Sequence, residues 1–336
     1  MEPILLLTIF VSFFCTFLGI PIWIKKSKEI GLTWQDMNKQ GQKQGVAGSG
    51  GIVPVLGAII GIFLYLAIQT FIFKNLGGVQ IYIFAIISSM LLVAGIGLID
   101  DLFGWVKGGM SVKSKVVLIL LAAIPLMVIN AGQSNIQGIE LGILYPLLII
   151  PLGILGSTVA FNMIAGFNGL EAGQGILLVG SLSIVAFLTG NPWLSVIGAC
   201  FVASLVAFYI FNLNPAKVFP GDVLTFSIGL LIACIAILGN MEKIAIFFFI
   251  PYILEVILKI RGKIGLKKKG FAHNFGVPNE DGSLELRYDK IYSLTHLSLF
   301  ILKKMKKSGK AYEQEVVWLI HFFQMVIIVL GLWLFL

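Results

Sequence analysis

The sequence predicts an all-α integral membrane protein with about ten transmembrane helices, and two observations lead to this prediction. Of the 336 residues, 58% are hydrophobic and only 12% are charged, a composition far too apolar for a soluble domain. The apolar residues also fall into runs of about 20, the length at which a helix crosses a hydrocarbon core of roughly 30 Å. The short alternating segments of a transmembrane β-barrel do not appear in the sequence.

The expected spans follow one another along a single polytopic membrane domain, 1–336, with one long polar insertion, 261–317, before the last span. The first apolar run has no basic segment before it and is followed by Lys25 and Lys26, so we expect a retained anchor rather than a cleaved signal peptide. In order, the expected spans are 4–24, 46–70, 81–99, 115–130, 142–161, 175–189, 193–211, 223–238, 243–260 and 318–336.

Basic residues gather in alternate loops of this arrangement. Every Lys and Arg except Lys74 and Lys243 lies on one side, and the largest group extends from Lys259 to Lys310. Because loops rich in Lys and Arg stay in the cytoplasm, we expect both termini to be outside or lumenal. The net charge of +8 then reflects contact with anionic headgroups, and no nucleic-acid partner is expected. The plasma membrane and the endoplasmic reticulum are both compatible locations.

The polar insertion 261–317 divides into a loop and an amphipathic segment. From Ile291 to Lys310, apolar residues recur at helical spacing and lysines occupy the other positions. An amphipathic helix lying in the membrane interface is one interpretation. A helix packed against the cytoplasmic side of the protein is the other, and the sequence leaves both open.

Asp100 and Asp101 directly follow the third apolar run, so the sequence places two adjacent carboxylates at the cytoplasmic end of that span. Carboxylates at a helix C-terminus oppose the helix dipole and repel each other, which argues against a purely structural role. Adjacent acids can bind a divalent cation or serve as a general base. A solvated pair of loop acids is the alternative interpretation.

A glycine-rich polar segment, Asn162 to Gly175, follows the fifth span. Its glycines permit tight turns and close approach of backbone N–H groups to a ligand. Asn162, Asn168, Glu171 and Gln174 offer donors and acceptors for a base or a sugar. Helix packing would explain the glycines, but it does not require these four polar side chains together.

Phe219-Pro220-Gly221-Asp222 forms a turn before the eighth span and leaves Asp222 near a helix N-terminus. Helix capping is the simple interpretation of an Asp at that position. Asn162 and the Asp100-Asp101 pair are expected on the same membrane face, however. Asp222 is therefore a candidate ligand for Mg²⁺, which prefers oxygen ligands together with a substrate diphosphate.

His273 lies in the loop of the insertion, after the run Lys267-Lys268-Lys269. A lone loop histidine is usually incidental. The neighbouring lysines favour an anionic ligand nearby, so we expect His273 to contact a phosphate or a sugar.

At these residues the chain resembles the polyprenyl-phosphate N-acetylhexosamine-1-phosphate transferases, and most closely those of the eukaryotic and archaeal UDP-GlcNAc:dolichyl-phosphate type. The resemblance covers about residues 31–303, most of the chain. It depends on the long signature from Asn162 to Gln174, on Asp100-Asp101 and on Phe219-x-Gly221-Asp222. Weaker similarities are Asp36-x-Asn38-Lys39, Gln44-Gly45-Val46 and the tail from His273 to Lys303.

The resemblance implies a ten-helix enzyme with its active site on the cytoplasmic face. It would move a hexosamine 1-phosphate, above all GlcNAc 1-phosphate, from a UDP-sugar to polyprenyl or dolichyl phosphate and release UMP. These substrates and the membrane lipids are the implied partners, and a homodimer is left open. The implied site has Mg²⁺, or Mn²⁺ in its place, held by Asp222 and Asn162; catalytic Asp100, Asp101 and Lys115; and substrate-binding Gly166, Asn168, Glu171, Phe219, His273, Asn274 and Gln44.

Departures from the family pattern affect the choice of sugar. Bacterial relatives carry Asp where this chain has Ala165 and Asn168, which argues against a MurNAc-pentapeptide substrate. Eukaryotic relatives carry Arg where this chain has Asn274, which leaves the selection of the hexosamine open.

Two other membrane classes are weaker interpretations. Transporters place binding residues near the bilayer midplane in broken helices of repeated halves, and this sequence shows no obvious repeat. A membrane prenyltransferase would need further acids shortly after the first pair, and Leu102-Phe103-Gly104 supplies none.

Overall fold

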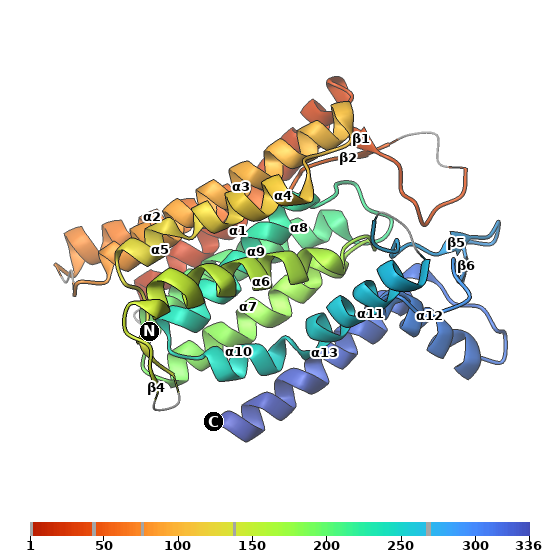
Figure 1. Ribbon diagram of the computed structural model, residues 1–336. Coiled ribbons are helices and arrows are strands. Elements are labelled where there is room, and N and C mark those ends of the chain that lie inside the picture. Colours follow the sequence, from red (N-terminus) through yellow and green to blue (C-terminus); the bar gives the residue numbers. More distant parts are fainter. Residues whose placement is uncertain (1–2, 42–44, 75–76, 137–138, 267–269) are drawn as a thin grey trace.

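The computed structural model describes residues 3–41, 45–74, 77–136, 139–266 and 270–336, and it consists of a bundle of long helices (Figure 1). Within these ranges, 8 helices are long and apolar enough to cross a membrane. The protein is therefore an all-α integral membrane protein, as the composition predicts.

Helices form most of the described chain, and the strands are short. The helices are α1 (Leu6–Glu29), α2 (Ile52–Ala67), α3 (Gln80–Lys107), α4 (Val112–Ala122), α5 (Ile124–Val128), α6 (Ile150–Met163), α7 (Leu170–Leu188), α8 (Pro192–Asn212), α9 (Gly221–Leu238), α10 (Glu242–Phe248), α11 (Ile250–Leu266), α12 (Leu294–Met305) and α13 (Glu313–Phe335). A short 3-10 helix, η1 (Pro3–Leu5), precedes α1, and the π-helical segments η2 (Ile68–Ile72) and η3 (Tyr145–Ile149) adjoin α2 and α6. The antiparallel strand pairs are β1 (Thr33–Trp34) with β2 (Val46–Ala47), β3 (Asn135–Ile136) with β4 (Ile139–Glu140), and β5 (Val277–Pro278) with β6 (Leu284–Glu285).

Two of the ten expected spans are divided into shorter helices. The span expected at 115–130 is α4 followed by α5, and the span expected at 243–260 is α10 followed by α11. Pro125 and Pro251 are the second residues of α5 and α11. Proline lacks an N–H group and restricts the residue before it, so an uninterrupted helix cannot pass through these positions without losing a hydrogen bond.

The end of α3 differs from the sequence expectation. This helix continues to Lys107 and ends where Gly108 adopts a left-handed φ of 91°. Asp100 and Asp101 therefore lie inside the helix, and the argument that they oppose its dipole at the C-terminus was wrong. Similarly, α11 continues to Leu266, so the polar loop begins later than the expected residue 261.

The amphipathic segment forms α12, which packs against α11 and α13. Leu294, His296 and Leu299 are among the buried residues of this helix, whereas Phe300 and Met305 are exposed. The buried face agrees with the interpretation of a helix packed onto the protein.

Helix α9 occupies the centre of the bundle: 83% of its most apolar window is buried, compared with 22% for α1. It packs against α3 and α6. A Cβ atom on Gly97 of α3 would lie 2.5 Å from the backbone of Val223, so only glycine permits this approach. The close contact brings the aspartate pair of α3 beside the first turn of α9.

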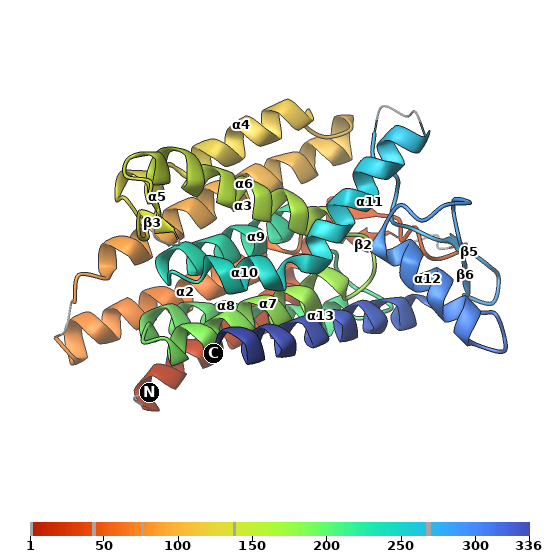
Figure 2. The ribbon, with the colours of Figure 1, turned by 60° about the horizontal axis from the view of Figure 1, so that its bottom comes forward.

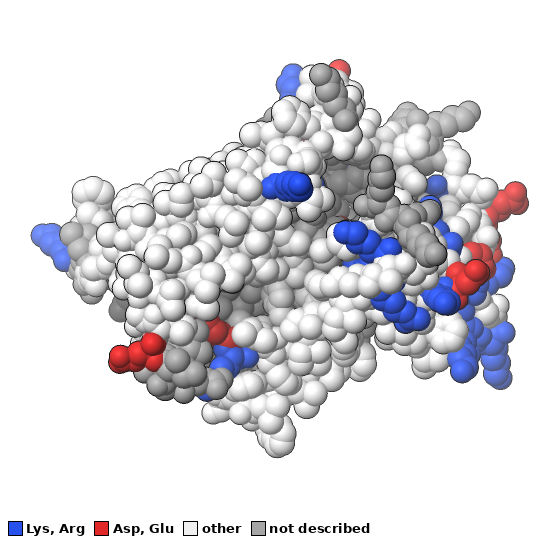
Figure 3. Space-filling model, viewed as in Figure 1, with Lys and Arg blue, Asp and Glu red and all other residues white. Residues whose placement is uncertain are grey.

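The bundle has two distinct ends. Both chain termini lie at one end, and the β1–β2 pair, the β5–β6 pair and α12 lie at the other (Figures 1 and 2). Figure 3 shows that Lys and Arg side chains gather on the visible face mainly at the end that carries α11 and α12. The charge asymmetry expected from the sequence is thus present along the axis of the bundle.

Candidate active site

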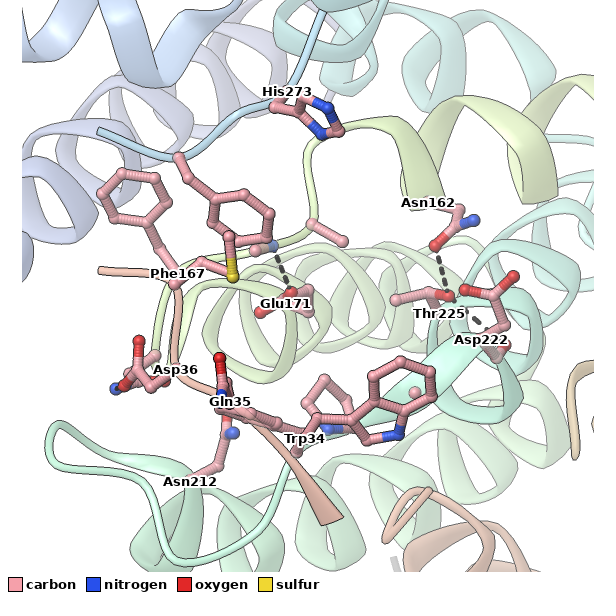
Figure 4. A pocket seen from close by; sticks show the side chains of 18 of the residues that line it. Trp34, Gln35, Asp36, Asn162, Phe167, Glu171, Asn212, Asp222, Thr225 and His273 are labelled. Carbon is pink, nitrogen blue, oxygen red and sulfur yellow. Dashed lines mark hydrogen bonds between the residues drawn. The ribbon is translucent and has the colours of Figure 1, made fainter. Parts of the chain in front are cut away.

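A cavity of about 760 Å³ opens at the basic end of the bundle. Its walls come from segments far apart in the sequence: residues 33–37 around β1, the turn 165–168 between α6 and α7, residues 219–222 at the start of α9, and the loop that carries His273 and Phe275 (Figure 4). A cavity of this size, with polar side chains converging on an otherwise apolar surface, is typical of a ligand-binding site.

The structure brings most of the expected site residues together. Those that line the cavity are Asn162, Gly166, Asn168, Glu171, Phe219, Asp222 and His273. Asp100, Asp101 and Lys115 do not line it, but each contacts Asp222 or its neighbours. Gln44 lies outside the described residues.

Lys115 joins carboxylates from two different helices. Its Nζ forms an ion pair with Asp100 of α3 and lies 3.1 Å from Oδ2 of Asp222 of α9. The other oxygen of Asp100, Oδ1, accepts a hydrogen bond of 2.6 Å from the backbone N–H of Met110. A buried carboxylate needs such partners, and the shared ammonium group partly neutralises both acids.

Asp101 holds the backbone at the start of α9. Its Oδ1 accepts a hydrogen bond of 2.8 Å from the backbone N–H of Asp222. Gly221 has a φ of 68°, and a Cβ atom there would lie 2.0 Å from Oδ2 of Asp101. Glycine is therefore required in the Phe-Pro-Gly-Asp turn, and Asp101 positions Asp222 through its main chain.

Thr225 connects the two predicted metal ligands, and it was not among the site residues expected from the sequence. Its hydroxyl donates a hydrogen bond of 2.9 Å to Oδ1 of Asn162 and lies 3.3 Å from the carbonyl oxygen of Asp222 (Figure 4). The three-residue spacing from Asp222 puts Thr225 on the same face of α9, and this spacing was the available signal.

The cavity has two parts, and in the part that contains Asp222, Asn162 and Thr225 the donor atoms fit Mg²⁺. Within the described ranges, no group of three or more His, Cys, Asp or Glu side chains is arranged to hold a metal. Mg²⁺ does not need such a group, because it usually takes one or two carboxylates and completes its shell with water and substrate phosphates. Asp222 and Asn162 both line the cavity and supply oxygen atoms of the kind that Mg²⁺ prefers.

The other half of the cavity is aromatic and amide-rich. Phe167 and Phe275 contribute rings to the part of the cavity around the turn 165–168, whereas Trp105 belongs to α3 and the indole of Trp34 lies beside that helix, on the side of Asp222 (Figure 4). Glu171, only 4% exposed, accepts a hydrogen bond of 2.7 Å from the backbone N–H of Gly166 and so holds the turn between α6 and α7. Flat rings and fixed polar groups suit the binding of a planar base.

The two asparagines expected to bind substrate are engaged within the protein. The side-chain amide of Asn168 donates a hydrogen bond of 2.8 Å to Oδ2 of Asp36. Asn274 is buried outside the cavity, where its amide donates to the carbonyl oxygens of Met163 and Ala165 at 2.9 and 2.6 Å. The structure therefore places Asn274 behind the wall of the cavity and gives it a supporting position.

The protein has 3 histidines, and only His273 lines the described part of the cavity. Its backbone N–H donates a hydrogen bond of 3.2 Å to the hydroxyl of Tyr288, and its exposed ring stacks with Phe275 at 6.5 Å between centroids. His296 of α12 is buried instead, and burial lowers its pKa to about 4, so this ring is neutral near pH 7.

Comparison with known proteins agrees with this geometry. Residues 83–240 match the model of glycosyl transferase family 4. The chain is also 34% identical over 320 residues to a protein of Saccharolobus solfataricus that bears the provisional name UDP-N-acetylglucosamine–dolichyl-phosphate N-acetylglucosaminephosphotransferase, with 93% of this chain and 91% of the relative covered. The protein belongs to glycosyl transferase family 4. The resemblance stated from the sequence motifs is thereby confirmed.

Two further relatives show the range of sequence similarity. A Sulfolobus acidocaldarius protein with the same provisional name is 31% identical over 324 residues, covering 94% of this chain and 92% of the relative. The phospho-N-acetylmuramoyl-pentapeptide-transferase of Halalkalibacterium halodurans is 29% identical over 286 residues, covering 80% and 86%. The matched family region contains the aspartate pair, Lys115, the Asn162–Gly175 segment and Asp222.

Proposed function

We propose that this protein transfers GlcNAc 1-phosphate from UDP-GlcNAc to a polyprenyl or dolichyl phosphate and releases UMP. The observation that carries the proposal is the composition of one cavity. Its aromatic, amide-rich half can hold a base, and its other half presents Asp222 and Asn162 beside the Lys115 cation. Family membership and the names of the archaeal relatives support the same reaction.

The two halves match the parts of a nucleotide sugar. The uracil would lie near Gly166, Phe219 and the surrounding rings, and the diphosphate would extend towards Asp222. An oxygen of the lipid phosphate would attack the β-phosphorus of UDP-GlcNAc. The bond from that phosphorus to the bridging oxygen would break, and UMP would leave with the bridging oxygen and the electron pair. The new diphosphate would join the lipid to GlcNAc.

The residues of the chain have separable tasks in this reaction. Lys115 lies where it can offset the charge of the phosphates, while Asp100 orients its ammonium group. Asp101 fixes the backbone of Asp222 and thereby the direction of its side chain. Mg²⁺ held by Asp222 and Asn162 would supply charge neutralisation at the diphosphate. No covalent intermediate with the protein is required.

A transfer assay tests the proposed function. Purified protein would be incubated with Mg²⁺, a polyprenyl phosphate and one UDP-sugar labelled in the sugar. We expect label from UDP-GlcNAc to enter the lipid fraction together with stoichiometric release of UMP, and no transfer without the lipid phosphate. UDP-MurNAc-pentapeptide, as a competing donor, should transfer little label. Absence of lipid-linked label, or preference for the muramoyl donor, would contradict the proposal.

A transporter is not supported by these observations. The cavity is lined by residues around β1, and β1 lies at one end of the bundle (Figure 1), whereas transporters use sites near the bilayer midplane. Membership of a transferase family argues in the same direction. Sealed vesicles that contain the protein and labelled UDP-GlcNAc would distinguish the two functions. A transferase would move label to the lipid and leave the remaining UDP-GlcNAc inside the vesicles, whereas a transporter would release it.

The basic end of the bundle should face the cytoplasm. This orientation follows from the distribution of Lys and Arg and puts the cavity where nucleotide sugars are available. Two exposed glutamates allow a matched test: Glu280 lies beside β5 at the basic end, and Glu140 lies in β4 at the opposite end. In a background lacking the native cysteines, Glu140→Cys should react with an impermeant maleimide in intact cells, and Glu280→Cys only after permeabilisation. The reverse pattern would place the cavity on the wrong side for this reaction.

A further inference from the structure

A buried carboxylate at the start of the last helix touches the cavity wall from behind. Glu313, the first residue of α13, is 3% exposed. Its Oε1 accepts a hydrogen bond of 2.8 Å from the backbone N–H of Asn168, and its Oε2 forms an ion pair with Lys39. The last span was expected to begin at residue 318, so Glu313 was not among the expected site residues.

Asn38 extends these contacts to two further parts of the wall. Its Nδ2 donates to the carbonyl oxygen of Gly166 at 3.1 Å and to Oε1 of Glu313 at 3.4 Å. Its Oδ1 accepts a hydrogen bond of 3.2 Å from the backbone N–H of Gly276. Gly276 directly follows Phe275, whose ring lines the cavity. The side chain of Asn38 is 2% exposed, so water does not replace these bonds in the folded protein.

The contacts join three segments of the cavity wall. Residues 33–37 continue into Asn38 and Lys39, the turn 165–168 ends in Asn168, and Phe275 precedes Gly276. Helix α13 contributes no lining residue in the described part of the cavity, yet its first side chain meets two of these segments. A carboxylate also suits this place electrostatically, because the N-terminus of a helix favours negative charge.

We propose that Glu313 is a positioning residue that sets the shape of the nucleotide-binding half of the cavity. It holds the 33–39 segment against the 166–168 turn through Lys39, Asn38 and the backbone of Asn168. The inference rests on the proposed function, because it assigns the affinity for the UDP-sugar to this contact. Removing the negative charge should loosen the wall that faces the base and leave the Asp222 and Lys115 cluster unchanged.

Glu313→Gln is the most informative substitution. It keeps the size of the side chain but loses the ion pair with Lys39 and turns an amide N–H group towards the lysine ammonium group. We expect KM for UDP-GlcNAc to rise roughly tenfold, with kcat within about threefold of the wild type. The dissociation constant of UMP, measured by calorimetry, should rise by a similar factor, since UMP carries the uracil and ribose of UDP-GlcNAc but lacks its GlcNAc group.

Glu315→Gln is the matched control. Glu315 lies in the same turn of α13 and forms an ion pair of 2.7 Å with Lys306, away from the cavity. Its substitution should leave KM and UMP binding unchanged. A purely structural role of Glu313 would instead lower kcat in proportion to the folded fraction, at unchanged KM. If Glu313→Gln does not fold, Lys39→Gln removes the same ion pair from its partly exposed side and should raise KM in the same direction.

The outcomes separate this inference from the proposed function. Wild-type protein that transfers GlcNAc 1-phosphate, combined with unchanged KM and UMP affinity in Glu313→Gln or Lys39→Gln, overturns the inference alone. Wild-type protein that neither binds UMP nor transfers label overturns the proposed function itself. A KM increase in Glu315→Gln equal to that in Glu313→Gln also overturns the inference, because the effect would then belong to the whole helix turn.

Discussion

Asp222→Asn should lower kcat of the transfer reaction by about 10³-fold while leaving the protein folded. Asp222 is at the start of the central helix α9, and its carboxylate reaches the cavity beside Lys115. The amide keeps the shape of the side chain but loses the charge that balances the lysine and suits a divalent cation. Asp222→Ala should be equally damaging. Initial rates at saturating UDP-GlcNAc and lipid phosphate, with the thermal unfolding midpoint measured in detergent, would check both statements.

A surface aspartate provides the control for this experiment. Asp281 is an exposed loop residue that forms an ion pair of 2.6 Å with Lys310, and its hydrogen bond with that lysine lowers its pKa. Asp281→Asn removes the same charge at a residue that does not line the cavity and should change kcat by less than a factor of about two, because exposed ion pairs contribute little. Near-normal turnover by Asp222→Asn would mean that Asp222 has only a structural role at the start of α9. It would also contradict the proposal that Asp222 binds Mg²⁺.

The sequence was sufficient for the fold class because long apolar runs have few alternatives in a membrane. A backbone in hydrocarbon must satisfy its own hydrogen bonds, so each run had to become a helix. Helix limits were less predictable. Apolar composition does not show that α3 continues through Leu102 and Phe103 to Lys107, nor that Pro125 and Pro251 divide two expected spans. Those limits depend on local backbone chemistry that hydrophobicity does not report.

The site was predictable where chemistry is concentrated in short motifs. Asp222, Asn162 and the Asp100-Asp101 pair meet as the motifs suggested, because spans of similar length end at the same face. Residues that act through tertiary contacts were harder to predict. Thr225 falls within an expected apolar span and Glu313 within the polar insertion 261–317, and the packing of α9 and α13 gives them their partners. For Asn274, the family resemblance implied a contact with the substrate. In the structure its side-chain amide instead donates hydrogen bonds to two backbone carbonyl groups of the protein.

The two adjacent aspartates have different partners, and only the structure shows which partner each one has. Side chains at neighbouring positions of a helix point about 100° apart, so Asp100 and Asp101 cannot share one partner in the same way. Asp100 meets the ammonium group of Lys115, while Asp101 meets the backbone N–H of Asp222. One acid therefore orients a cation and the other orients a carboxylate. A motif of two identical residues thus contains two different tasks, which the sequence alone could not separate.

Lys115→Met should lower kcat by about 10²-fold, the largest effect we expect from a substitution outside Asp222. The ammonium group of Lys115 bridges Asp100 and Asp222, so its loss leaves two carboxylates facing each other without a cation. Lys115→Arg should retain part of the activity, because it keeps the charge but changes the geometry. Lys113→Met is the control, since Lys113 is exposed in the same helix turn and its variant should turn over at nearly the wild-type rate.

The decisive measurement combines Lys115→Met with Asp222→Asn. Residues that act as one unit show strongly non-additive losses, because the second substitution removes an arrangement that the first has already destroyed. The double variant should therefore be no more than about threefold slower than Asp222→Asn alone. If the two losses multiply instead, Lys115 acts on the substrate independently of Asp222. The ion pair between them would then stabilise the resting enzyme without contributing to the arrangement that carries out the transfer.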